Sequence, residues 1–178
     1  MHRARQPGQP HVFVRRGESV VTHPEASLLT HPAHTPNFQV SYASSLGSDG
    51  QTIADAILAT CEADYTTLQG YFGGISPAGL PFQIRVTSGN TGASHATCLA
   101  TGLSIGARSA PGVDTAFMRQ LVIAEEDEVF MANFGHGWDC GASNGEGLSR
   151  VLANDMVPGA EPAGFVSAPV WLLSLIHI

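Results

Sequence analysis

The sequence predicts an α+β fold: a small mixed sheet with an edge strand, a central acid-rich helix and a following helix. Three observations support this class. Short segments alternate apolar and polar residues, as strands with one buried face do. Longer segments repeat apolar residues at the spacing of a helix turn. Glycine, proline and aspartate separate the two kinds of segment, so turns are expected between them.

The first strand is expected at the segment FQVSYAS, because Phe38, Val40 and Tyr42 lie on one face of an extended chain. The first helix follows it and is expected to end at the pair Gly73-Gly74. In chain order, the predicted strands or strand-like segments are 38–44, 81–88, 93–100 and 102–108, and the predicted helices are 51–72, 114–132 and 145–156.

The helix from Asp114 to Ala132 is expected to be central, because apolar residues occur on all of its sides. Asp114 is a typical N-cap, and Gly135 is a typical helix stop. Adjacent acids in such a helix are costly unless they are protonated, hydrated, hydrogen-bonded or bound to a cation. The alternative is an acidic, solvated patch on a partly exposed helix. The acids concerned are consecutive: Glu125, Glu126, Asp127 and Glu128.

The two ends of the chain differ from the middle. Residues 1–37 contain five of the eight histidines and repeated His-Pro pairs without any strand or helix period, so a disordered or non-native N-terminal extension is expected there. The α+β domain is expected to span residues 38–172 and to be truncated at its C-terminus. Residues 173–178, LSLIHI, match the translation of a transposon end used to tag sequencing libraries, and we expect them to be an adapter tail.

Composition excludes several classes of function. The formal net charge is −7 at pH 7, and from residue 38 onward thirteen acids face four arginines, so nucleic-acid binding by the folded part is not expected. No apolar run approaches the roughly 20 residues of a transmembrane helix, so we expect a soluble protein without a membrane partner. The three cysteines lack CxxC spacing, which disfavours a structural zinc site and leaves the compartment open.

Two short segments resemble the gluzincin type of zincin metallopeptidase. AEEDE (124–128) stands where that family carries HExxH, and Glu146-Gly147 in NGEGLSRVLA (144–153) resembles the Glu-Gly step that opens its next helix. The resemblance covers residues 38–158 and implies a zincin-like core. It further implies that Glu125 is the general base, that Glu146 is a metal ligand, and that an extended peptide lies along an edge strand at 102–108.

The departures from the motif are specific. In HExxH two histidines one turn apart bind zinc, and the glutamate activates water. Here Ala124 replaces the first histidine, and Glu128 replaces the second with an oxygen ligand. With this degenerate HExxH motif we expect a metallopeptidase-like domain without a cofactor, acting as a non-proteolytic binding or structural protein.

Two enzymatic alternatives stay open. In the first, Glu125, Glu128 and Glu146 surround a divalent cation such as Ca²⁺, Mg²⁺ or Mn²⁺, and Glu125 is the general base of a hydrolase. In the second, two carboxylates act as acid and base without a metal.

Three further residues are assigned to substrate binding. His95, in the strand-like segment GASHATC, can supply an imidazole or orient a substrate, although a strand histidine is more often a hydrogen-bonded filler. His136 and Trp138 lie in the loop GHGWDCG between the two last helices. Loop histidines usually face solvent, and Trp138 can equally pack over the helix pair.

Overall fold

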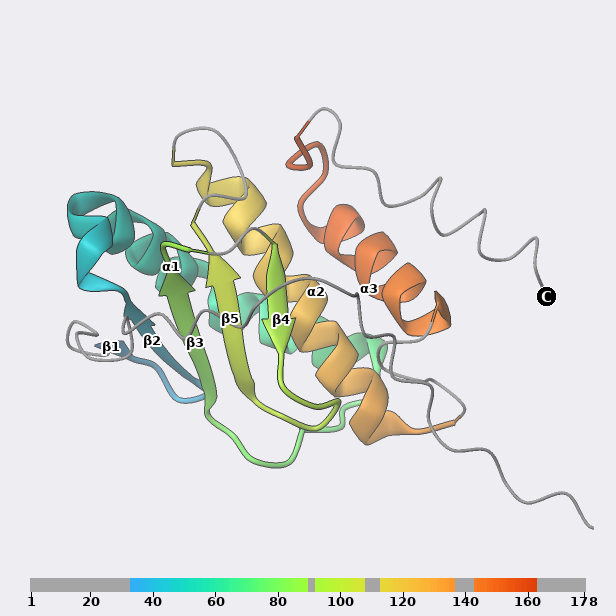
Figure 1. The fold of residues 1–178 in the computed structure, drawn as a ribbon. Helices are drawn as coiled ribbons and strands as arrows, with labels where there is room; N and C mark the ends of the chain where they lie inside the picture. Colours follow the sequence, from blue (N-terminus) through green and yellow to red (C-terminus); the bar gives the residue numbers. More distant parts are fainter. Residues whose placement is uncertain (1–32, 90–91, 108–112, 137–142, 163–178) are drawn as a thin grey trace, which may run out of the picture.

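A computed structural model describes residues 33–89, 92–107, 113–136 and 143–162 of the chain (Figure 1). It confirms the α+β class. The elements in chain order are β1 (Ala33–His34), β2 (Phe38–Tyr42), the 3-10 helix η2 (Ser44–Leu46), α1 (Gly47–Tyr71), β3 (Phe82–Thr87), β4 (Ala93–His95), β5 (Gly102–Gly106), α2 (Thr115–Phe134) and α3 (Ser143–Met156).

The five strands form one mixed sheet in the order β1-β2-β3-β5-β4. Strands β2, β3 and β5 are parallel, whereas β1 and β4 pair antiparallel at the two ends of the order. The prediction that 102–108 forms the edge strand is therefore wrong, because β5 lies between β3 and β4. The physical reason is that the backbone of β5 is paired on both edges, with β3 (Ile84↔Leu103) and with β4 (His95↔Leu103), so neither edge is open. The edge strand that contacts α2 is β4.

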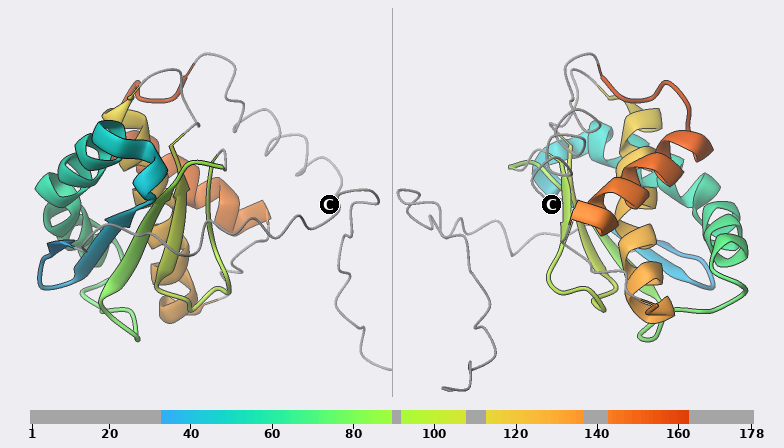
Figure 2. Two further views of the ribbon diagram at one scale, coloured as in Figure 1. Left: turned by 60° about the vertical axis from the view of Figure 1, so that its left-hand side comes forward. Right: turned by 90° about the vertical axis from the view of Figure 1, so that its right-hand side faces the viewer.

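Helices α1 and α2 cover one face of the sheet, and α3 packs against α2 beyond the β4 end (Figures 1 and 2). The alternation within β3 explains which face is covered. Phe82, Ile84 and Val86 are buried, whereas Gln83 and Arg85 are exposed. Only the first set can therefore meet the helices, because successive strand residues point to opposite faces.

Aromatic side chains join the sheet to α1 and α2. Phe38 of β2 stacks on Phe82 of β3 with ring centroids 5.5 Å apart. Phe130 of α2 contacts two rings of α1 or its C-cap, Tyr65 at 5.3 Å and Phe72 at 5.7 Å. These contacts fix the rotation of α2, and with it the direction in which its acids point.

The predicted ends of α2 agree with the structure. The Asp114 side chain accepts a hydrogen bond from Phe117 N at 3.0 Å and caps the helix. Gly135 follows the helix with φ at 74°, a left-handed conformation that glycine adopts without strain. The helix extends two residues beyond the predicted end at Ala132, to Phe134.

The domain begins before the predicted boundary at Phe38. Residues 33 and 34 form β1, whose Ala33 pairs with Val40 of β2. Asn37 donates hydrogen bonds from its backbone N and its Nδ2 to the Glu62 carboxylate of α1, each at 2.8 Å. The expectation of an extension outside the fold is thus wrong for residues 33–37. Residues 1–32 and the expected adapter tail 173–178 lie outside the described residues.

A partly buried ion pair, in which the carboxylate is the buried member, links α1 to α2. Arg119 donates from Nε and Nη2 to the Asp64 carboxylate at 2.8 and 2.6 Å, and Asp64 is 4% exposed. Replacing Arg119 by methionine is expected to lower the free energy of unfolding by about 3 kcal/mol, because it leaves a buried carboxylate unpaired. Denaturant unfolding measures this change.

A matched control is Tyr71→Phe, which removes the exposed hydrogen bond between Tyr71 Oη and Asp155 on α3. It is expected to cost under about 1 kcal/mol. Equal losses in the two variants would show that the Arg119–Asp64 pair does not stabilise the packing of α1 on α2.

Candidate metal centre

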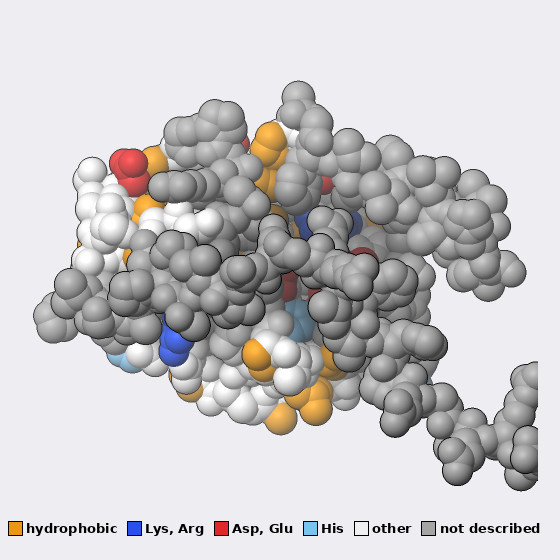
Figure 3. Space-filling view, viewed as in Figure 1, with side chains coloured by type: hydrophobic (Ala, Val, Ile, Leu, Met, Phe, Trp, Pro, Cys, Tyr) orange, Lys and Arg blue, Asp and Glu red, His pale blue; other side chains and the backbone are white. Residues whose placement is uncertain are grey.

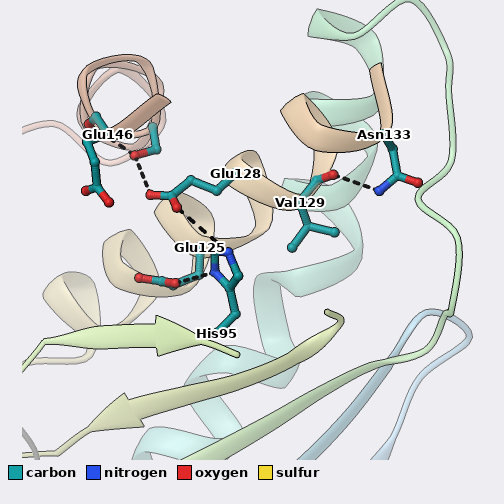
Figure 4. Close-up of polar contacts among 7 residues, drawn as sticks. His95, Glu125, Glu128, Val129, Asn133 and Glu146 are labelled. Carbon is teal, nitrogen blue, oxygen red and sulfur yellow. Dashed lines mark hydrogen bonds and ion pairs between the residues drawn. The ribbon is translucent and has the colours of Figure 1, made fainter. Parts of the chain in front are cut away.

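The candidate site lies where α2 passes between the edge strand β4 and α3. Glu125 and Glu128 are three residues apart on α2, so they share one helix face. His95 is the last residue of β4, which contacts α2. Two elements that are distant in sequence, β4 and α2, thus bring an imidazole and two carboxylates to one place (Figure 4).

The three side chains form a compact group. His95 Nδ1 lies 2.7 Å from Glu125 Oε2, and His95 Nε2 lies 3.8 Å from Glu128 Oε2. Each residue offers one ligand atom such that all three atoms lie within 4.8 Å of one another. Within the described ranges this is the one group of three or more potential metal ligands at such distances.

The group is largely removed from solvent. The side chains of His95, Glu125 and Glu128 are 5%, 12% and 7% exposed. In the space-filling view, histidine and acidic side chains meet near the centre of the face shown (Figure 3). Charges in such a position require compensation by a partner or an ion.

Glu128 has a second partner that fixes its orientation. Ser149 of α3 is fully buried, and its hydroxyl lies 3.1 Å from Glu128 Oε1 and 3.2 Å from the backbone oxygen of Glu146. A hydroxyl has one proton, so it donates to one of these acceptors at a time. The contact occupies one carboxylate oxygen of Glu128, and the other, Oε2, is the oxygen that faces His95.

The side chains of the group shift one another's pKa values. The hydrogen bond to Glu125 raises the pKa of His95, against the opposing effect of burial, and the charges of Glu125, Glu128 and Glu146 add to it. Burial raises the pKa of Glu128 to about 7, helped by the charges of Glu146 and Glu125. A proton or a cation is thus favoured between these side chains.

Glu146 lies beside the group but is not a member of it. It sits in the first turn of α3, is solvent-exposed, and extends from α3 on the side of Glu125 and Glu128 (Figure 4). Its charge is the second-largest cause of the raised pKa of Glu128. The following helix therefore brings Glu146 alongside the acids of α2.

The other two acids of the run are buried elsewhere. Glu126 and Asp127 are both 0% exposed, and their four carboxylate oxygens lack hydrogen-bond partners among the described residues. Burial raises the pKa of Glu126 far above its usual range and that of Asp127 to about 8. The alternative of a solvated acidic patch is wrong, because α2 is enclosed by the sheet, α1 and α3.

His136, a second predicted substrate-binding residue, does not join the group. His136 follows α2 roughly three helix turns beyond Glu125. It is exposed, and its ring lies 4.6 Å from that of Phe134. Trp138 lies outside the described residues. Of the two described residues assigned to substrate binding, His95 and His136, only His95 lies among the acids of the site.

Sequence reasoning missed the direct contact of His95 with the acids. Thirty positions separate His95 from Glu125. The available signal was the position of His95 in a strand-like segment just before the central helix. That position indicates proximity to the central helix, but it does not indicate which way the imidazole points.

The donor set fits a divalent cation. It consists of one imidazole nitrogen and two carboxylates, and with neutral His95 its charge of about −2 matches that of the ion. A His₂Glu zinc site of the gluzincin type is not formed by the described residues. The mixed nitrogen and oxygen ligands fit Mn²⁺, Fe²⁺ or Zn²⁺ better than Ca²⁺ or Mg²⁺, which prefer oxygen ligands alone.

Comparison with known proteins gave no match: neither protein-family models, nor curated proteins, nor solved structures resemble this chain detectably. What the site can do is therefore inferred from its own residues. Among the described residues, no helix has the length and apolarity needed to cross a membrane.

Proposed function

We propose that this chain is a divalent-metal-dependent hydrolase with a zincin-like core, in which His95, Glu125 and Glu128 hold the ion. The observation that supports the proposal most is the convergence of these three ligand atoms within 4.8 Å. Without His95 the group would be purely acidic, and acidic groups are common without an ion. The imidazole supplies the nitrogen ligand that the degenerate motif lacks.

The residues divide into separate roles. His95, Glu125 and Glu128 bind the ion, and Ser149 orients Glu128. A bound divalent cation supplies Lewis-acid activation of water at neutral pH. This differs from the role that the gluzincin resemblance implies for Glu125, which serves here as a ligand and not as the general base. The resemblance itself supports the proposal through the order of elements and the Glu146-Gly147 step.

The sheet order changes the strand along which a peptide partner could bind. Because β5 lies inside the sheet, an extended peptide cannot pair with 102–108. The strand beside the site is β4, and a peptide lying there would pass His95. A peptide or similar acyl substrate is therefore the class that we propose.

One contact favours a second candidate function, a metal-free binding or structural domain. The 2.7 Å contact between His95 and Glu125 neutralises one carboxylate when the imidazole is protonated. In that case the group is a structural ion pair that ties β4 to α2. The two candidates differ in whether a metal binds, which is directly measurable.

The test uses the whole chain after removal of metal with a chelator. Calorimetric titration is expected to show one equivalent of Mn²⁺ or Zn²⁺, bound more tightly than Ca²⁺. Glu128→Gln is expected to abolish this binding, whereas His136→Ala, which removes an exposed imidazole outside the group, leaves it unchanged. Absence of binding, or binding that Glu128→Gln does not affect, would reject the metal-dependent hydrolase and favour the metal-free domain.

Ser149 provides a further prediction about the same site. Its replacement by alanine is expected to weaken metal binding by roughly 10- to 100-fold, because an orienting partner of a ligand is lost. Ser45→Ala removes a hydroxyl that contacts Ser88, away from the site, and serves as the control. Equal metal affinities in Ser149→Ala and the wild type would show that Ser149 does not orient Glu128 for binding.

A further inference from the structure

Glu125 is poorly placed to act as a general base. Its carboxylate lies 2.7 Å from His95 Nδ1, and its side chain is 12% exposed. It is also a member of the compact ligand group. A carboxylate that binds the ion and contacts the imidazole has little freedom to take a proton from a reacting water.

Glu146 has the properties that Glu125 lacks. It is exposed, so protons can exchange between its carboxylate and solvent. It lies beside the group without belonging to the set of mutually close ligand atoms (Figure 4). It lies in the first turn of α3, one turn from Ser149, the residue that contacts Glu128.

We propose that Glu146, and not Glu125, is the proton acceptor of the reaction. This inference rests on the proposed function, since it assigns a residue within that same site. The roles that the gluzincin resemblance implies are thus exchanged: Glu125 becomes a ligand and Glu146 becomes the base. The exchange follows from the position of His95 at the end of β4. Its contact with Glu125 makes Glu125 a member of the ligand group.

The proposed reaction is the hydrolysis of an acyl substrate with Glu146 as general base. A proton passes from water to a Glu146 carboxylate oxygen while the water oxygen forms a bond to the substrate carbonyl carbon. The bond from that carbon to the leaving group then breaks, and Glu146 returns the proton to the leaving atom. Glu146 ends in its starting state, and the products are a carboxylic acid and the protonated leaving group.

The two role assignments predict opposite results for two variants. Glu146→Gln is expected to bind Co²⁺ within about 10-fold of the wild type, because no ligand is lost, and to hydrolyse at least about 100-fold more slowly. Glu125→Gln is expected to lose Co²⁺ binding. If Glu146 were a ligand and Glu125 the base, the metal would be lost in Glu146→Gln and retained in Glu125→Gln.

The experiment loads the whole chain with Co²⁺ and records affinity, visible spectrum and hydrolysis of 4-nitrophenyl acetate. The control is Asp155→Asn, which removes an exposed acid from the same helix outside the site. We expect Glu146→Gln to keep the wild-type Co²⁺ spectrum, which reports the ligands directly, and to lose hydrolysis. Asp155→Asn is expected to keep both.

Two results overturn the inference. One is a changed spectrum or an affinity loss above about 100-fold in Glu146→Gln, which would make Glu146 a ligand. The other is hydrolysis by Glu146→Gln at the wild-type rate while the wild type hydrolyses faster than buffer. Failure of the proposed function is distinct, because the wild type would then bind no Co²⁺ or would hydrolyse the ester no faster than buffer.

Discussion

Replacing His95 by alanine is expected to weaken Zn²⁺ or Mn²⁺ binding by well over the roughly 100-fold that loss of an outer-shell partner can cost. Two effects combine. The single nitrogen ligand of the group is lost, and Glu125 and Glu128 then face each other without the imidazole between them. Competition against a chromogenic chelator measures the dissociation constant over this range.

The control for this prediction must exclude the other histidines of the chain, because five of the eight lie in residues 1–37 and can bind metal weakly. His34→Ala and His136→Ala remove imidazoles outside the group and are expected to leave the affinity unchanged. A His95→Ala variant that binds one equivalent with wild-type affinity would contradict a site built on His95.

The second large effect concerns stability and pH. The pKa of Asp127 is raised from 3.8 to about 8 by burial, and burial also raises the pKa of Glu126 well above its usual value. The folded state therefore holds these protons more tightly than the unfolded state. The free energy of unfolding is expected to fall by several kcal/mol as the pH rises from about 4 to about 8. The raised pKa of His95 acts in the same direction.

Asp127→Asn isolates the contribution of Asp127 to the pH dependence of the free energy of unfolding. It removes the titrating proton while keeping the shape of the side chain, so the fall in stability between pH 4 and 8 should become shallower. Asp55→Asn changes an exposed acid of α1 and is the matched control. Urea unfolding of the metal-free chain at several pH values measures both. Wild-type stability that rises with pH over this range would contradict the burial of Glu126 and Asp127 without partners.

Much of the fold was predictable because local signals agreed with tertiary packing. The alternation at Phe82, Ile84 and Val86 identified β3 together with its buried face. At α2, the cap at Asp114 and the stop at Gly135 are set by backbone chemistry that depends little on the rest of the chain. Such elements can be located from the sequence to within a few residues.

Sheet order was less predictable. The segments around β4 and β5 are both short, and neither has turn chemistry that specifies its neighbours. β5 pairs parallel with β3 and antiparallel with β4, so the backbone groups of both its edges are bonded inside the sheet. This pairing depends on the assembly of the whole sheet, so the edge was assigned to the wrong strand.

The candidate group was predicted in part. The motif resemblance selected Glu125 and Glu128, which belong to the group, and Glu146, which lies beside it. Helical spacing indicated that the first two share a face. A run of four acids has the same sequence whether its members are solvated or buried, so the burial of Glu126 and Asp127 could not be deduced. The contact of His95 depends on the register of β4 against β5, which no local pattern specifies.

The central claim is that one imidazole and two carboxylates of this chain share a divalent ion. Zinc-edge X-ray absorption of the loaded whole chain tests it directly, since imidazole rings give a characteristic multiple-scattering signal. We predict one imidazole and otherwise oxygen ligands, with the imidazole signal lost in His95→Ala. A shell of oxygen alone, or of two or more imidazoles, would contradict a site formed by His95, Glu125 and Glu128.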